Sequence, residues 1–153
     1  MRIVRSLVMA ATLSSLAGAA FAQDAGMAAI GARQALMKMQ AYYLGQLGMM
    51  AQGKVPYDAK AAAIAANGLE AISSVDFGSL FPKGTDNAAE PKSKALPAAW
   101  ASMDDFVAKY GDLHKASLTL QAQAGNGLDA LKANFGPVAG TCGACHKEYR
   151  AAN

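Results

Sequence analysis

Two cysteines and a histidine stand close together near the end of the chain, in the stretch Cys142-Gly143-Ala144-Cys145-His146. They are the only two cysteines of the 153 residues. On a helix, positions three apart lie about one turn apart on one face, so both sulfurs can bond the two vinyl groups of one porphyrin. The histidine that follows can bind the iron from one side of the ring. The spacing predicts one haem c, attached covalently through Cys142 and Cys145, with His146 as an iron ligand.

Other chemistry also uses cysteines at this spacing. A structural disulfide, a metal site and a thioredoxin-like redox pair are the alternatives. A redox pair would stand at the start of a helix that follows a strand, and no strand pattern precedes Cys142. Haem attachment is therefore the preferred interpretation, and a thiol redox enzyme without haem is the alternative.

The N-terminus has the pattern of a secretory signal peptide. Arg2 and Arg5 precede an apolar stretch that reaches Ala20-Phe21-Ala22, a small-x-small cleavage site. The apolar stretch contains Thr12, Ser14 and Ser15 and is short for a membrane span of about 20 residues, so a membrane anchor is the second choice. We expect residues 1–22 to be removed, the mature protein to begin at Gln23, and the compartment to be the periplasm, where covalent haem attachment takes place.

Composition and charge limit the partners. The whole chain has a formal net charge of +3 at pH 7, and loss of Arg2 and Arg5 leaves about +1. There is no long basic run, zinc pattern or phosphate-binding glycine loop, so nucleic acid is not an expected partner. The mature length suffices for one domain with one core.

Four stretches carry apolar residues at helical spacing, and none shows the alternation of a strand. They are residues 24–52, 59–74, 97–125 and 128–149, with Pro137 expected to kink or restart the last one. Residues 75–96 are rich in glycine, proline and charge and are predicted to form an ordered crossover. The inward-facing residues of the second and third helices are expected to be Ile64, Ala65, Leu69 and Ile72, and Trp100, Met103, Val107, Tyr110, Leu113 and Leu118. The predicted fold is all-α, an antiparallel four-helix bundle with the haem near the C-terminus of helix four.

The mature chain resembles the class II c-type cytochromes, the cytochrome c′ group. The residues that carry the resemblance are Arg33-Gln34-x-x-Met37, Gly53-Lys54-x-Pro56-Tyr57-Asp58, Leu80-Phe81-Pro82-x-Gly84, Pro97-x-x-Trp100 and Cys142-x-x-Cys145-His146-x-x-Tyr149-Arg150. The commoner class of c-type cytochromes has its haem motif near the N-terminus, so a C-terminal motif favours this family.

The family resemblance gives Met37 a decisive position, four residues after Arg33. In high-spin cytochromes c′ that position is usually a non-ligating residue such as leucine, and small gases bind the five-coordinate iron. In the low-spin branch, which includes the cytochrome c-556 type, a methionine there is the sixth ligand. The resemblance thus implies that Met37 binds iron, although it could also be ordinary core packing, and Met39, Met49 and Met50 lie nearby.

The resemblance also implies roles for the residues around Met37. Arg33 lies one turn away and is expected to bind a haem propionate, and Gln34 is expected near the propionates. His114 is the only histidine outside the motif, and we expect it to be an exposed residue and not a ligand.

The function expected from these residues is periplasmic electron transfer by a low-spin His/Met haem, and not enzyme catalysis. The alternative is a five-coordinate cytochrome c′ that binds or buffers nitric oxide or carbon monoxide. Expected partners are redox proteins, with no membrane span after signal cleavage and with the first helix as a candidate homodimer face. The lysines could form a docking surface for an acidic partner, but a solvated surface is the simpler interpretation.

Overall fold

The computed structural model describes residues 2–152, with side chains from Asp24 to Ala152. The helices are α1 (Arg2–Ala51), α2 (Ala59–Ser73), α3 (Ala98–Ala101), α4 (Met103–Gln123) and α5 (Leu128–Tyr149), together with one 3-10 turn, η1 (Gly78–Leu80). The predicted signal peptide and its cleavage site lie outside the residues whose side chains the structure describes. From Asp24 to Ala152, no helix is both long and apolar enough to cross a membrane.

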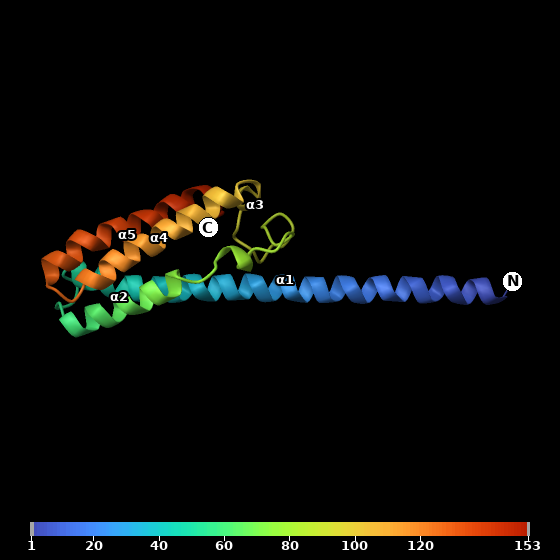
Figure 1. Ribbon diagram of the computed structural model, residues 1–153, viewed down its shortest axis with the longest axis horizontal. Coiled ribbons are helices and arrows are strands. Elements are labelled where there is room, and N and C mark those ends of the chain that lie inside the picture. Colours follow the sequence, from blue (N-terminus) through green and yellow to red (C-terminus); the bar gives the residue numbers. More distant parts are fainter. Residues whose placement is uncertain (1, 153) are drawn as a thin grey trace.

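Four long helices form an antiparallel bundle, as predicted. Figure 1 shows α1 and α2 side by side below α4 and α5, with successive long helices running in opposite directions. Each long helix packs mainly on two of the other three: α1 packs on α2 and α5, and α4 packs on α2 and α5. The crossover between α2 and α4 lies at the end of the bundle where α4 begins.

The turns between helices follow from particular residues. Gly53 ends α1 with a φ of +68°, a conformation that glycine adopts without a steric penalty. Its N–H bonds the Met50 carbonyl at 3.0 Å and the next N–H bonds the Met49 carbonyl at 2.9 Å, the two bonds of a Schellman motif. Asp58 caps α2 by accepting a hydrogen bond from the Ala61 N–H at 2.7 Å. These local contacts make the α1–α2 hairpin short and antiparallel.

The predicted helix over 97–125 is divided in two. Ser102 leaves the helical region, with φ −132° and ψ 51°, so α3 is a separate turn before α4. Trp100 on this turn points to the crossover, where its Nε1–H donates to the Phe81 carbonyl at 3.0 Å. This long-range bond has no local sequence signal.

Three residues that we expected in the core are on the surface. Ile64, Val107 and Leu118 are 57%, 41% and 43% exposed. In each case an adjacent residue is buried instead: Ala65 beside Ile64, Phe106 beside Val107 and Ser117 beside Leu118. The inward residues are Ala62, Ala65, Ala66 and Leu69 on α2, and Phe106, Tyr110, Leu113, Ser117 and Leu120 on α4. Of the two outcomes expected at Pro137, a kink or a restart, there is no restart, because α5 continues through it as one helix.

Small residues on α2 let α1 approach closely. The ring of Tyr43 on α1 lies over Gly68 on α2, and an added Cβ at Gly68 would lie less than 3.0 Å from three ring carbons. The buried residues of α2 are Ala62, Ala65, Ala66, Leu69 and Ser73, all but one of them small. The α1–α2 contact therefore depends on the absence of a side chain at Gly68.

We expect Gly68→Ala to destabilise the fold by about 1–3 kcal/mol, since the tyrosine ring must move to accommodate the new methyl group. Gly111→Ala is the matched control, because Gly111 lies within α4 with nothing within 4 Å of an added Cβ. The control should stabilise the protein by about 0.5–1 kcal/mol through the higher helix propensity of alanine. Urea unfolding of both variants measures the difference, and equal effects would contradict the packing argument.

Candidate haem-binding site

A cavity of about 430 Å³ lies between α1, α4, α5 and the crossover. Its volume is within the range of cofactor pockets. Most of its wall is apolar, and every residue predicted for the site lines it: Cys142, Cys145, His146, Met37, Arg33 and Gln34. The structure thus brings together residues that are about 110 positions apart in the chain.

The two cysteines lie on α5, and both are partly buried and free of a disulfide. Burial raises the pKa of Cys142, and it raises the pKa of Cys145 to about 11. A thioredoxin-like pair has the opposite environment, at a helix N-terminus that lowers a thiol pKa. These cysteines stand in the last turns of α5, near the negative end of the helix dipole. The environment therefore gives the thiol redox alternative no support.

His146 follows on the same helix and also lines the cavity. Burial lowers its pKa, and the nearby Arg150 guanidinium lowers it further. Both effects favour the neutral imidazole, which is the form that binds a metal. The α5 end that carries His146 is fixed to the crossover, because the Leu96 N–H bonds the Tyr149 carbonyl at 2.9 Å.

Met37 reaches the same cavity from α1. The three neighbouring methionines do not line it: Met39 and Met49 are 50% and 44% exposed, and Met50 is buried in the core. Geometry thus separates Met37 from the residues that competed with it in the sequence. Its bond to iron stays a prediction.

Arg33 is buried, and its guanidinium is held by the crossover. Nη1 donates to the Leu80 carbonyl at 3.2 Å and to Thr85 Oγ1 at 2.9 Å. Nη2 donates to the Thr85 carbonyl and to Ser93 Oγ, the latter at 2.6 Å. The guanidinium also lies 4.6 Å from the centre of the Phe81 ring. Both terminal nitrogens are thus engaged by residues 80–93, and Arg33 anchors the crossover to α1 whether or not it also contacts a propionate.

Gln34 makes a weaker contact with the same segment. Its Nε2 donates to the Lys92 carbonyl at 2.8 Å in an exposed position. Gln34 and Arg33 together attach two points of the crossover to neighbouring residues of α1. The propionate role of Gln34 stays a prediction.

Sequence reasoning missed Gln40, a buried residue of the cavity wall. Its Nε2 donates to the Tyr110 hydroxyl at 2.8 Å, and that hydroxyl donates to the Ile72 carbonyl at 3.1 Å. Burial raises the pKa of Tyr110 to about 12. The sequence does contain a signal for Gln40. This residue lies seven residues after Arg33 and three after Met37, so it shares the helix face of both.

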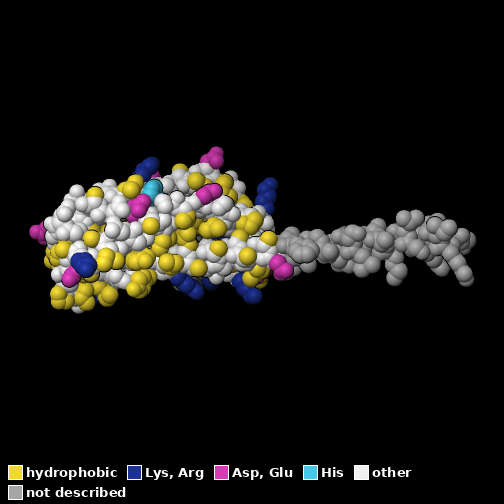
Figure 2. Space-filling view, turned by 60° about the horizontal axis from the view of Figure 1, so that its bottom comes forward, with side chains coloured by type: hydrophobic (Ala, Val, Ile, Leu, Met, Phe, Trp, Pro, Cys, Tyr) yellow, Lys and Arg dark blue, Asp and Glu magenta, His cyan; other side chains and the backbone are white. Residues whose placement is uncertain are grey.

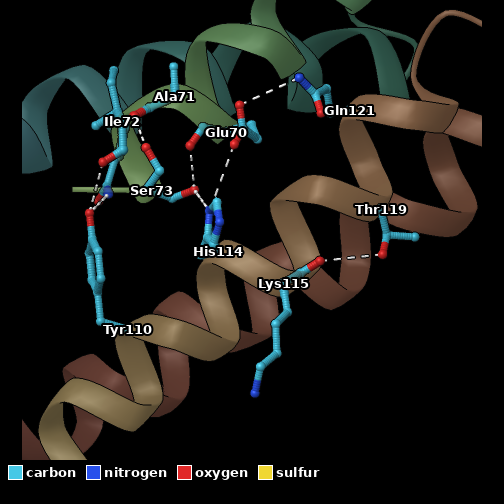
Figure 3. A network of polar contacts seen from close by, with 11 residues as sticks. Glu70, Ala71, Ile72, Ser73, Tyr110, His114, Lys115, Thr119 and Gln121 are labelled. Atoms are coloured by element: carbon cyan, nitrogen blue, oxygen red, sulfur yellow. Dashed lines mark hydrogen bonds and ion pairs between the residues drawn. The ribbon is translucent and has the colours of Figure 1, made fainter. Parts of the chain in front are cut away.

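His114 lies outside the cavity lining, in the contact between α2 and α4. Figure 3 shows it pointing at Ser73 and Glu70, with Tyr110 farther along the same helix. Ser73 Oγ donates to the Glu70 carbonyl at 2.8 Å, and His114 Nδ1 lies within hydrogen-bond distance of Ser73 Oγ, at 3.2 Å. The role of His114 in this structure is to link two helices.

We expect Arg33→Ala to destabilise the protein by at least about 2 kcal/mol, because it leaves buried acceptors of the crossover without partners. Hydrogen exchange should accelerate at the backbone amides of residues 80–95 more than in α2. Gln34→Ala is the matched control, since it removes one exposed bond to the same segment, and it should cost under about 1 kcal/mol. Unchanged exchange in Arg33→Ala would contradict the anchoring role.

Comparison with known proteins decides the family. The profile described as Cytochrome C' matches residues 28–150. The chain belongs to the cytochrome c′ family. A cytochrome c-554 of Cereibacter sphaeroides is 41% identical over 144 residues, which cover 93% of this chain and 94% of that protein. This confirms the resemblance to class II c-type cytochromes.

Solved structures of the cytochrome c′ family share the fold. Cytochrome c′ from Rhodobacter sphaeroides is 33% identical, with a TM-score of 0.81 over 84% of this chain and 98% of that one. A nitric oxide complex of a cytochrome c prime mutant from Alcaligenes xylosoxidans is 28% identical, with a TM-score of 0.73 over 83% of this chain and 97% of that one.

As a member of the cytochrome c′ family, the chain carries one covalent haem c, and Cys142 and Cys145 are its only cysteines. The cavity has the chemistry that this group needs. Its apolar wall suits the porphyrin, and both thiols reach it from one helix face. It is lined by the five cations Arg33, Lys38, Lys94, Lys109 and Arg150 and by no carboxylate, which suits a group with two propionates.

Proposed function

We propose that this cytochrome c′ homologue is an electron carrier whose iron is low-spin, bound by His146 on one side and by Met37 on the other. One observation carries the proposal: a histidine on α5 and a methionine on α1 line one cavity with both haem-binding cysteines. The haem supplies a one-electron redox couple. The protein acts as a carrier and not as an enzyme.

The side chains of the cavity determine the ligation of the iron and its reduction potential. Burial and the Arg150 guanidinium lower the pKa of His146, which favours its neutral imidazole. The thioether of Met37 is a soft ligand that favours ferrous iron and raises the reduction potential. Phe77, Phe81 and Phe106 exclude water from the wall, and a low dielectric there disfavours the extra positive charge of the oxidised state.

Replacement of Met37 by leucine tests the proposal. Leucine nearly conserves the volume, so the fold should change by less than about 1.5 kcal/mol. The ferric and ferrous spectra should change from low-spin to high-spin, the reduction potential should fall, and carbon monoxide should bind rapidly.

Met39→Leu and Met49→Leu are matched controls, because both residues are exposed and neither lines the cavity. Both controls should keep the wild-type spectrum. If Met37→Leu stays low-spin, the sixth ligand is another residue. If the wild type is already high-spin, Met37 only lines the cavity.

The second candidate function is gas binding by a five-coordinate iron. What favours it is the relative whose solved structure is a nitric oxide complex. In that case Met37 would form a wall of the distal side, beside Leu44 and Ala41. The spectrum of the wild-type protein distinguishes the two functions before any variant is made.

Export and haem attachment can be tested in one measurement. We propose that the protein is periplasmic and begins at Gln23, from the sequence pattern of residues 1–22 and the family. The intact mass of the exported protein should equal residues 23–153 plus one haem. The double variant Cys142→Ala/Cys145→Ala should lose the haem mass in acid organic solvent. Retention of residues 1–22 would indicate a membrane anchor instead.

A homodimer is supported by the outer face of α1. Met39, Tyr42 and Met49 on this helix are 50%, 64% and 44% exposed. Figure 2 shows broad hydrophobic patches on the side of the molecule that α1 and α2 form. Large apolar side chains gathered on one face are typical of an interface. We propose that this face pairs with a second copy.

A further inference from the structure

The charges of the mature chain are distributed unevenly. After loss of Arg2 and Arg5 it carries twelve Lys and Arg and eleven Asp and Glu. Five of the twelve cations line the haem cavity, and none of the eleven carboxylates does. A nearly neutral protein thus concentrates positive charge at one place, where low-dielectric walls strengthen its field.

Three of these cations form an exposed rim, which we define as Lys38, Lys94 and Arg150. They come from α1, the crossover and the residue that follows α5. None of them makes an ion pair with any described residue, whereas Lys109 deeper in the site lies 3.3 Å from Glu148 Oε1. Among the described residues the rim therefore has no ion-pair partner.

The backbone of the rim is held in place. Ala95 and Arg150 form an antiparallel bridge, and the Ala151 N–H bonds the Lys94 carbonyl at 2.9 Å. Lys94 and Arg150 thus keep neighbouring positions at the mouth. Cations fixed around one opening repel each other, and an anion placed there relieves the repulsion.

The haem propionates do not account for all of this charge. Two propionates bring two negative charges to a cavity with five cations, one of which is already matched by Glu148. Positive charge therefore remains at the rim of the loaded protein. A docking surface that surrounds the site of electron exchange is where charge complementarity speeds an encounter most.

We propose that the rim of Lys38, Lys94 and Arg150 is the docking surface for an acidic protein, which places its carboxylates over the cavity mouth. This inference rests on the proposed function, because it identifies the chemistry of the redox partner at the same site. Lys38 and Lys94 attract the acidic partner during its approach. In the complex, the acidic patch of the partner then covers the mouth of the cavity.

The test uses two small oxidants of opposite charge on the reduced holoprotein. Each takes one electron: hexacyanoferrate(III) is an anion and tris(phenanthroline)cobalt(III) is a cation. By stopped flow, the rate with the anion should fall as ionic strength rises, and the rate with the cation should rise. The opposite dependence, or none, would overturn the proposal.

Two double variants separate the rim from net charge. Lys38→Gln/Lys94→Gln should lower the low-salt rate with hexacyanoferrate about tenfold. Lys54→Gln/Lys132→Gln loses the same charge from exposed positions that do not line the cavity, and its rate should stay within about twofold of wild type. If both double variants lower the rate equally, net charge alone determines the rate, and this would contradict a docking rim.

A binding measurement without electron transfer identifies the kind of partner. Calorimetry should show that poly-L-glutamate binds the wild type and Lys54→Gln/Lys132→Gln. Its binding to Lys38→Gln/Lys94→Gln should be at least tenfold weaker. Binding to anionic phosphatidylglycerol vesicles without binding to polyglutamate would overturn the proposal in favour of a lipid surface. The optical spectrum reports iron ligation separately, so failure of the Met37 proposal is distinguishable from failure of this one.

Discussion

The guanidinium of Arg33 is the contact on which the site depends. Between α2 and α3 the crossover has one 3-10 turn as its only helical element, so its carbonyls and hydroxyls need partners from elsewhere. Arg33 supplies four hydrogen bonds from a buried position on α1 and lies over the Phe81 ring. The crossover in turn carries Phe81, Lys94 and Ala95 to the cavity wall. One side chain thus connects the helix that bears Met37 to the segment that encloses the cavity.

Most of the fold and the site could be predicted because their signals are local. The turn at Gly53, the cap at Asp58 and the apolar spacing of the helices each involve a few neighbouring residues. The spacing of Cys142, Cys145 and His146 similarly describes one helix face. Family resemblance added Met37, and the structure brings it to the same cavity.

The missed features have long-range causes. Ser102 ends α3 with no glycine or proline in that turn, while Trp100 in that turn bonds a carbonyl 19 positions earlier. Arg33 was predicted from a resemblance as a propionate ligand, and no local pattern could show that residues 80–93 would occupy its terminal nitrogens. Ile64 faces solvent, while the adjacent Ala65 and Ala66 are fully buried. Which of two adjacent apolar residues turns inward is decided by the neighbouring helix, and the sequence of one helix does not contain that information.

The position of the cavity also has a consequence for assembly. Met37 comes from the first helix and His146 from the last. The two sides of the cavity are therefore formed by residues that lie far apart in the sequence. A chain that ends before α5 lacks one wall of the cavity. The cysteines belong to α5, so only a chain that includes this helix can bind and enclose the cofactor. Cofactor loading in this architecture therefore selects molecules that contain α5, and chains that end before it remain colourless.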